Sequence, residues 1–492
     1  MRENARKPAP CMARHQTAEQ GGCPPGGTHS ASYPPGASFG GGAYMRRITA
    51  VSALAFRAAL RTRTVLALLV LLALVVLALP HVIRGDGTPE GALQIRLVYT
   101  LTLSFGILCL VTLWAACSLF SAEIDSARIE LTVVKPVTPA QLWYGKWLAL
   151  VALDALMILL VYGGVYAQLR WTIHRGNWSE AQRPASRFVT HPQLPSVQEE
   201  ARQVYQQWAA EKKLPPKLSK ADVLRELANK APDRYSIISP GERVSWRFAP
   251  RRAVRAGDPV QVRMRLDTEF STSEAVSGRY LLSCTDEGGH TVETAWRDFT
   301  QKAIEFTVDS RQLTAATNAP LRNFELVFEH TGDEKVSSAI MTRFRKDVCL
   351  LTPGGSFEAN LARSALIELG VLAALAALGL TLSACLSLPV AAFTGTLLLL
   401  LFVVSDSINT VTIAEERKNI GNRIGYWVSE YVNRAVAFTS QTDPIGALAD
   451  GERIGDADLF RTMVGNYLVL PALFCFGGAW ILRRRELAEN SK

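Results

Sequence analysis

The stretch ALIELGVLAALAALGLTLSACLSLPVAAFTGTLLLLLFVVS, residues 365–405, carries a single charged side chain, Glu368. One helix of this length would be about 60 Å long, roughly twice the thickness of the hydrocarbon layer of a membrane. Pro389 interrupts the run, and proline breaks helices because it lacks an N–H and clashes with the preceding turn. The stretch therefore predicts two membrane-spanning helices in a tight hairpin, roughly 365–386 and 390–405.

Four further apolar runs are long enough to cross a membrane: Thr64–Val82, Leu97–Phe120, Trp147–Leu169 and Val464–Leu482. Asp154 is the only charge in the third, and Pro471 is tolerated in the last. We therefore predict an α-helical polytopic membrane protein with six transmembrane helices. Much of the formal net charge of +9 lies at the boundaries of these runs. We attribute it to the membrane and expect no nucleic-acid partner.

The orientation follows from basic residues in the short flanks of the spans. Several arginines precede the first span without an acidic neighbour, and Arg483, Arg484 and Arg485 follow the last. An even number of spans places both termini on one side, which we predict to be the cytoplasmic side of a bacterial inner membrane. The segments 170–362 and 406–463 are then external.

The first 44 residues are rich in Gly, Pro, Ser and Ala and have no apolar periodicity. Such a composition cannot bury enough apolar surface to offset its ordering entropy. We expect the segment 1–44 to be disordered. It is either an extension mistakenly included upstream of a true start at Met45 or a genuine disordered tail.

The predicted cytoplasmic loop 121–146 reads SAEIDSARIELTVVKPVTPAQLWYGK. Ile124 and Ile129 lie among charged residues in an amphipathic pattern that ends at Pro136. A short helix there would offer a docking surface to a cytoplasmic partner. The alternative is a solvated connector that lies on the membrane surface.

This loop resembles the conserved loop of ABC-2 type permeases, the membrane-spanning subunits of a class of ABC transporters. Ala127-Arg128 and Pro139 depart from the family pattern, and the resemblance also covers segment 46–63, the 365–405 hairpin and the arginine-rich end. The matching positions are Glu123, Glu130, Leu131, Pro136, Val137, Thr138, Gly145 and Lys146.

The resemblance implies that a separate ATPase subunit docks on the loop and that the permease pairs with a second copy or a paralogue. The chain has no G-x-x-x-x-G-K-[ST] sequence that would cradle phosphates. We therefore expect a transport subunit, not an enzyme: ATP is bound by the partner, and this chain carries no cofactor. Most members of the family are exporters.

The external segment 170–362 has two predicted parts. Residues 195–230 favour helix, whereas the apolar period becomes two between 236 and 350, as in Val244–Phe248 and Phe324–Phe328. Short strands separated by turns predict an immunoglobulin-like β-sandwich. Cys284 and Cys349 fall in strand-like stretches and could form a disulfide in an oxidising compartment.

Few residues suggest chemistry within the membrane. Asp154 either lines a substrate pathway or pairs two helices. Glu368, near the end of its span, is expected to reach the surface or to pair with Arg363. No catalytic arrangement and no metal-ligand spacing is present. The alternative function is a membrane-anchored extracytoplasmic binding or scaffold protein, in which the external segment does the work.

Overall fold

A computed structural model describes residues 41–61, 63–83, 89–125, 138–176, 184–193, 235–255, 258–268, 276–286, 291–300, 303–309, 320–331, 339–343, 347–411 and 443–489, with a few isolated positions between 202 and 227. Most of the predicted helical segment 195–230 and all of 126–137 therefore lie outside the described residues. By contacts, the chain divides into residues 1–45 and 46–492, and the fold below is that of the second unit.

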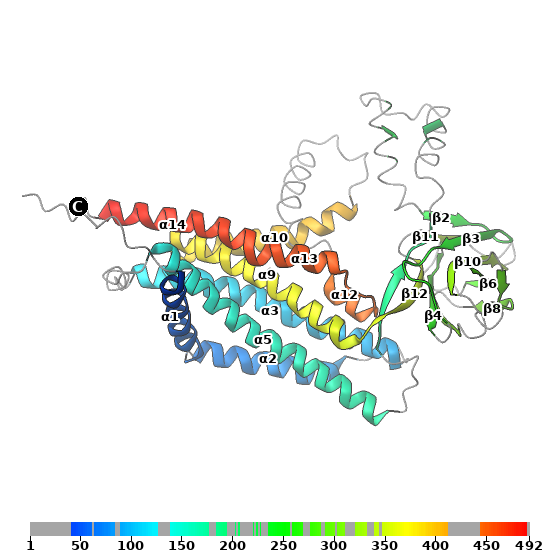
Figure 1. Ribbon diagram of the computed structural model, residues 1–492, viewed down its shortest axis with the longest axis horizontal. Helices are drawn as coiled ribbons and strands as arrows, with labels where there is room; N and C mark the ends of the chain where they lie inside the picture. The colour runs from blue at the N-terminus through cyan, green and yellow to red at the C-terminus, as the bar shows by residue number, and fades with distance from the viewer. Residues whose placement is uncertain are drawn as a thin grey trace, which may run out of the picture. The chain divides into compact units, whose positions relative to one another are not determined.

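The helical part contains α1 (Gly41–Leu60), α2 (Arg63–Val82), α3 (Pro89–Asp125), α5 (Pro139–Arg175), α9 (Phe357–Cys385), α10 (Leu388–Val411), α12 (Pro444–Ala449), α13 (Asp456–Val464) and α14 (Leu470–Glu489) (Figure 1). Within the described residues, five helical stretches are long and apolar enough to cross a membrane: Val65–Val82, Gly91–Ser121, Pro139–Arg175, Phe357–Cys385 and Asp456–Ile481. The chain is therefore a membrane-embedded helical protein. The sixth predicted span falls on α10, whose apolar stretch Leu388–Leu401 is shorter.

The hairpin in the 365–405 run has the predicted break. Helix α9 ends at Cys385 and α10 begins at Leu388, so Pro389 lies in the first turn of α10, where its missing N–H costs nothing. A small apolar cluster packs beside the break. The hairpin contributes Leu382, Leu386, Leu388 and Ala391, and α3 contributes Leu113 and Cys117.

The last span differs from the prediction, because its helix starts at Asp456 rather than near Val464. A π-helical turn, Gly465–Val469, joins α13 to α14. Pro471 follows this turn and has no N–H to donate, so the widened turn accommodates it without ending the helix. The turn lies against α9: the Tyr467 hydroxyl donates to the Leu366 carbonyl at 3.0 Å, and Gly370 admits Tyr467 and Thr462.

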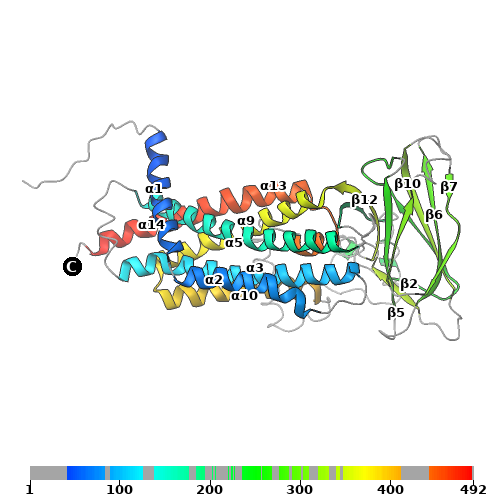
Figure 2. The same ribbon diagram turned by 90° about the horizontal axis from the view of Figure 1, so that it is seen from below.

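Helix α9 is the central element, because it contacts α3, α5, α10 and α14 (Figures 1 and 2). Its contact surface with α3, α5 and α14 consists largely of small residues. Gly379 shows how close the helices come, because a Cβ there would lie 2.6 Å from Ala116 Cβ and 3.1 Å from the Leu113 carbonyl oxygen. The buried residues of this surface are Ala373, Ala376, Ala377, Leu380 and Ala384.

Between α5 and α9 the chain forms three antiparallel sheets. One has the order β1-β12-β4-β9, the second β3-β10-β6-β7 with β8 paired to β6, and the third β2-β11-β5. The strands are β1 (Ser186–Thr190), β2 (Tyr235–Ile238), β3 (Arg243–Phe248), β4 (Pro259–Arg265), β5 (Asp267–Thr268), β6 (Ser277–Asp286), β7 (Thr291–Glu293), β8 (Arg297–Thr300), β9 (Ala303–Asp309), β10 (Leu321–His330), β11 (Ile340–Arg343) and β12 (Val348–Gly355).

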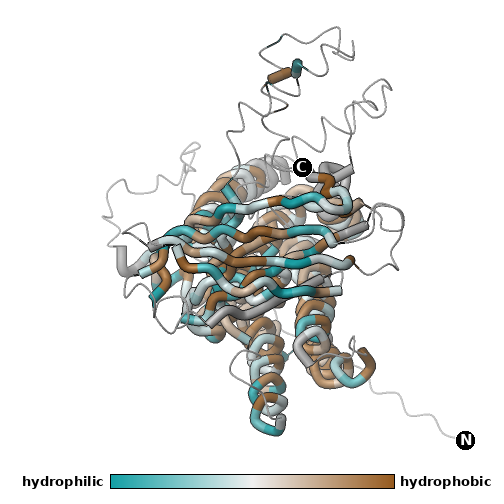
Figure 3. Tube along the Cα trace, turned by 90° about the vertical axis from the view of Figure 1, so that its right-hand side faces the viewer, coloured by the Kyte–Doolittle hydropathy of each residue, from teal (hydrophilic) through white to brown (hydrophobic). Residues whose placement is uncertain are grey.

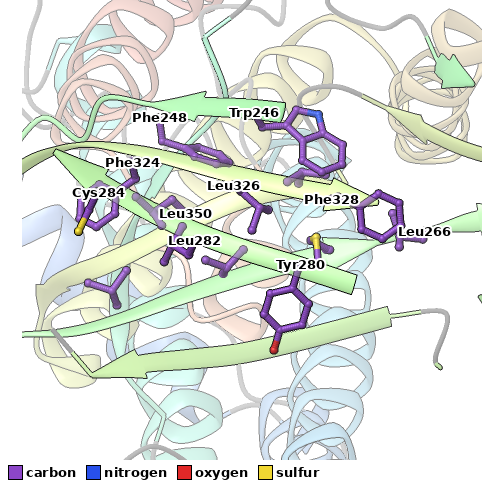
Figure 4. Close-up of a cluster of buried hydrophobic side chains, with 14 of the residues drawn as sticks. Trp246, Phe248, Leu266, Tyr280, Leu282, Cys284, Phe324, Leu326, Phe328 and Leu350 are labelled. Carbon is purple, nitrogen blue, oxygen red and sulfur yellow. The ribbon is translucent and has the colours of Figure 1, made fainter. Parts of the chain in front are cut away.

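The sheets share one hydrophobic core. Hydrophobic and hydrophilic residues alternate along several of the strands (Figure 3). Trp246, Phe248, Phe324 and Phe328 are fully buried and face Leu350 and other residues of β4 and β12 (Figure 4). The period of two predicted for this region is confirmed in β10, where burial alternates along Phe324–Phe328. Strand β1 is not among the predicted strands, and it pairs with β12 through Arg187, Phe188 and Val189.

Cys284 and Cys349 remain thiols, so the predicted disulfide is absent from this structure. Cys284 lies in β6 and belongs to the shared core. Cys349 lies in β12 between Val348 and Leu350, which both face that core. Because neighbouring residues of a strand point to opposite faces, Cys349 points away from Cys284.

The segment after α12 joins the helical part to the first sheet. Arg187 of β1 and Glu452 form a parallel bridge, and the Arg453 guanidinium donates to the Gly354 carbonyl at 2.7 Å. Arg263 of β4 reaches Glu452 at 3.2 Å and the Asp450 carbonyl at 2.7 Å. Strand β4 is consequently buried on both faces.

Candidate functional site

The residues that carry the family resemblance lie only partly within the described chain. Glu123 belongs to the last turn of α3. Glu130, Leu131, Pro136 and Val137 lie outside the described residues, as does the predicted amphipathic helix of the loop. Thr138, Gly145 and Lys146 are described, and all three belong to the beginning of α5.

Thr138 begins α5 as its N-cap. Its hydroxyl accepts from the Gln141 N–H at 3.3 Å, and the Gln141 side chain accepts from the Thr138 N–H at 3.0 Å. This reciprocal capping box satisfies backbone donors that a helix start leaves unpaired. Pro139, a departure from the family pattern, occupies the first helical position, where proline is favoured. The departure therefore strengthens the start of the helix.

Gly145 and Lys146 pack the beginning of α5 against two other helices, α1 and α3. A Cβ at Gly145 would lie 2.6 Å from Val51 Cγ1, so glycine allows α1 to pack directly on α5. Lys146 is buried, and its ammonium group donates to the Leu119 carbonyl of α3 at 3.2 Å. The same ammonium lies 4.0 Å from the centre of the Phe120 ring. We call Gly145 and Lys146, with their contacts, the α5 clamp.

Asp154 lies two turns further along α5, buried against α3. The Thr112 hydroxyl donates to its Oδ1 at 2.7 Å, while its Oδ2 has no hydrogen-bond partner among the described residues. Of the two roles predicted for Asp154, the geometry shows a hydrogen bond between two helices. Intramembrane carboxylates are costly and commonly mark either such contacts or pathways.

Glu368 contradicts the expectation that it reaches the surface or pairs with Arg363. It is 2% exposed, and Arg363 pairs instead with Asp456 at 3.2 Å. The carboxyl lies beside the Tyr162 hydroxyl of α5, and its Oε1 has no partner among the described residues. The sequence contained one usable signal: Ser364 and Glu368 are four residues apart and thus share a helical face.

These groups form a polar seam, defined by Thr112, Asp154, Tyr162, Ser364 and Glu368, where α3, α5 and α9 meet. The Tyr162 and Ser364 hydroxyls are 2.9 Å apart, and Ser364 also lies 3.3 Å from the Pro444 carbonyl at the start of α12. Cys109 of α3 lies within electrostatic range of both Asp154 and Glu368. The seam therefore links the middle of the bundle to the segment that touches the sheets.

A second interhelical contact compensates for a helix defect. Pro80 in α2 cannot donate to the carbonyl of Val76, four residues earlier. The Gln168 amide of α5 donates to that carbonyl at 2.8 Å instead. Neighbouring helices commonly satisfy backbone groups freed by proline in membranes. Gln168 therefore joins α2 to α5.

No three His, Cys, Asp or Glu side chains gather into a possible metal site within the described part of the chain. Comparison with models of known protein families finds no match, and comparison with curated proteins finds none either.

Proposed function

We propose that this chain is the permease subunit of an ABC transporter of the ABC-2 type. In this proposal it forms the substrate pathway, works with a second permease copy or paralogue, and exports its substrate with energy from a separate ATPase. Both termini are cytoplasmic in an inner membrane. The sheet-containing region is an external immunoglobulin-like sandwich.

The path of the chain supports six crossings. Helix α9 has 29 residues, about 43 Å of helix, and starts beside the sheets. Near this start Asn360 donates to the Glu452 carbonyl at 2.8 Å and accepts from the Ile454 N–H at 2.9 Å. The chain therefore returns along the length of α9 between Cys385 and Glu452. Counted with the five apolar helices, such a return supports the proposed six crossings, with both termini on one side.

The observation that carries the proposal is the α5 clamp. Gln94, near the beginning of α3, bonds Asp450 beside the sheets, whereas Leu119, 25 residues later in α3, accepts from Lys146. The loop between α3 and α5 thus leaves the bundle at the end opposite the sheets. There the clamp ties both sides of the loop, and α1, into one unit. A partner that pushes on the loop would move α3 and α5 together, and with them the polar seam.

The experiment is affinity purification of the full chain from its native membranes, followed by mass spectrometry. We expect an ABC ATPase subunit to be recovered with the wild-type chain. The double variant Glu123→Lys/Glu130→Lys should lose it while the chain remains folded. Glu293→Lys is the matched control, because it reverses an exposed charge in β7, in the sheet-containing region.

Equal recovery of the ATPase with the loop variant and the control would overturn the assigned docking surface. Recovery of no ABC ATPase with the wild-type chain would overturn the proposed function itself. The alternative would then hold, in which the helices anchor an extracytoplasmic binding or scaffold protein. Arg263 and Arg453 make contacts that hold the sheets to the bundle. A protein whose helices anchor its sheets would need such contacts as well.

A further inference from the structure

A large cavity lies where the end of α5 meets the connection between β12 and α9. Its volume is about 980 Å³, at the upper end of the range of small-molecule sites. The α5 side supplies residues from Tyr166 to Gly176, and the other side supplies Gly355 to Glu358 together with Pro184 and Ala185. Neither the α5 clamp nor the polar seam contributes to it.

The cavity lies at one boundary of the membrane. Helix α5 has 37 residues, about 55 Å, whereas about 20 residues cross the hydrocarbon layer. A layer centred on α5 would end near Tyr166, where the cavity begins. Trp171 is 56% exposed, and the Arg175 guanidinium lies 4.1 Å over its ring. Exposed tryptophan and arginine at a helix end are typical of the membrane–water boundary.

The walls of the cavity combine two chemistries. Leu169 and Phe357 are buried and form apolar walls with Ile173. Arg170 and His174 are exposed, and in the described part of the chain neither has a carboxylate within ion-pair distance.

Two features of the α9 side bear on the charge that the cavity accepts. Glu358, the one acidic residue among the described residues that line the cavity, accepts from the Tyr166 hydroxyl at 3.3 Å. The first residues of α9 also line the cavity, and the first turn of a helix carries the positive end of its dipole. Apart from Glu358, the charges of the described residues around the cavity therefore favour an anion.

From this geometry we propose that the cavity holds an anionic phospholipid, from the leaflet nearer to the sheets. Arg170 and His174 contact the phosphate, and the acyl chains leave along Leu169 and Ile173. An apolar wall beside an exposed arginine and a histidine suits an amphiphile better than a soluble anion. The inference requires only that the chain is embedded in a membrane and does not depend on the proposed transport function.

The test uses the purified full chain in detergent and native mass spectrometry with three probes. These are phosphatidylglycerol, phosphatidylcholine of the same acyl chains, and glycerol 3-phosphate. We expect retention of phosphatidylglycerol alone. Arg170→Gln/His174→Gln should weaken its binding by about fivefold, which corresponds to about 1 kcal/mol for a boundary arginine. Glu358→Gln should strengthen binding, because it removes an acidic group from the wall of the cavity.

The matched control is Arg57→Gln/Arg61→Gln, which removes two exposed cations at the end of α1. It should bind phosphatidylglycerol as the wild type does. Equal binding of the two phospholipids, or equal losses in the two double variants, would overturn the assignment. So would an unchanged affinity in both Arg170→Gln/His174→Gln and Glu358→Gln. Tight binding of glycerol 3-phosphate would overturn the lipid assignment, because the cavity would then be a site for a soluble anion.

Discussion

Helix α9 of the bundle and the core of the sheet-containing region contribute opposite kinds of residue to their packing. Large aromatic side chains fill the core of the sheets, with Trp246 and Phe328 among the fully buried ones. Helix α9 packs through alanines and Gly379. In water, burying large apolar area drives folding. In lipid the surroundings are already apolar, so helices gain mainly from close contact, which small residues allow.

The two regions also place their charges differently. Glu329 of β10 bonds Arg279 at 2.8 Å and Arg243 at 2.9 Å on the outside of a sheet. Asp154 and Glu368 lie inside the bundle. Partly solvated ion pairs contribute little stability, whereas buried carboxylates constrain which helices can meet. The comparison predicts that truncation harms the sheets most, that added bulk harms the bundle, and that acid weakens the ion pairs on the outside of the sheets.

The largest effect is expected from Phe328→Ala, which empties part of the aromatic core. Such truncations cost about 3–5 kcal/mol. Hydrogen exchange of the full chain in detergent should show lost protection in β3, β6 and β10 with α9 still protected. Phe393→Ala is the control, because Phe393 of α10 is 71% exposed. Loss of protection in both regions would show that they unfold as one unit.

The second effect concerns added volume between α3 and α9. Gly379→Val places side-chain atoms where Ala116 and the Leu113 carbonyl already lie, and overpacking costs about 1–3 kcal/mol. We expect a lower melting temperature in detergent. Gly106→Val in α3 is the matched control, because its Cβ meets nothing within 4 Å. Equal melting temperatures for the two variants would contradict the close contact of α3 and α9.

A smaller effect is expected within the polar seam. Thr112→Val removes the hydroxyl that donates to Asp154, and interhelical hydrogen bonds in membranes contribute about 0.6 kcal/mol on average. The melting temperature should fall slightly. The double variant Thr112→Val/Asp154→Leu should recover the loss, because no carboxylate then lacks its donor. A further decrease in the double variant would mean that Asp154 has a stabilising partner other than Thr112.

The smallest effect is the response of the sheets to acid. Hydrogen bonds from Arg279 and Arg243 hold the pKa of Glu329 below its usual range. A carboxyl with a lowered folded-state pKa contributes stability above its unfolded-state pKa, and the contribution is lost as the pH falls through the folded value. Protection of β10 should therefore decline below about pH 4.5, and less steeply in Glu329→Gln. Identical pH profiles would exclude this pair as the cause.

The sequence predicted the membrane-embedded helices and the alternating strands, because a long apolar run and a period of two are both local patterns. It also identified Pro389 as the break in the hairpin. It missed the burial of Glu368, because that depends on Tyr162, about 200 residues away. It missed the docking of Glu452 and Arg453 on β1 for the same reason. Alternation in the sequence did not show that the Cys284 side chain points into the core of the sheets and the Cys349 side chain points away from it. That depends on which face of each strand is turned toward the core.

The most direct test of the permease account is site-specific photo-crosslinking in native membranes. A photoreactive amino acid replaces Glu130 in one variant and Glu293, in β7, in the other. The account predicts that position 130 forms an adduct with an ABC ATPase subunit and that position 293 forms none. An ATPase adduct at position 293, or none at position 130 in a chain that remains folded in the membrane, would contradict it.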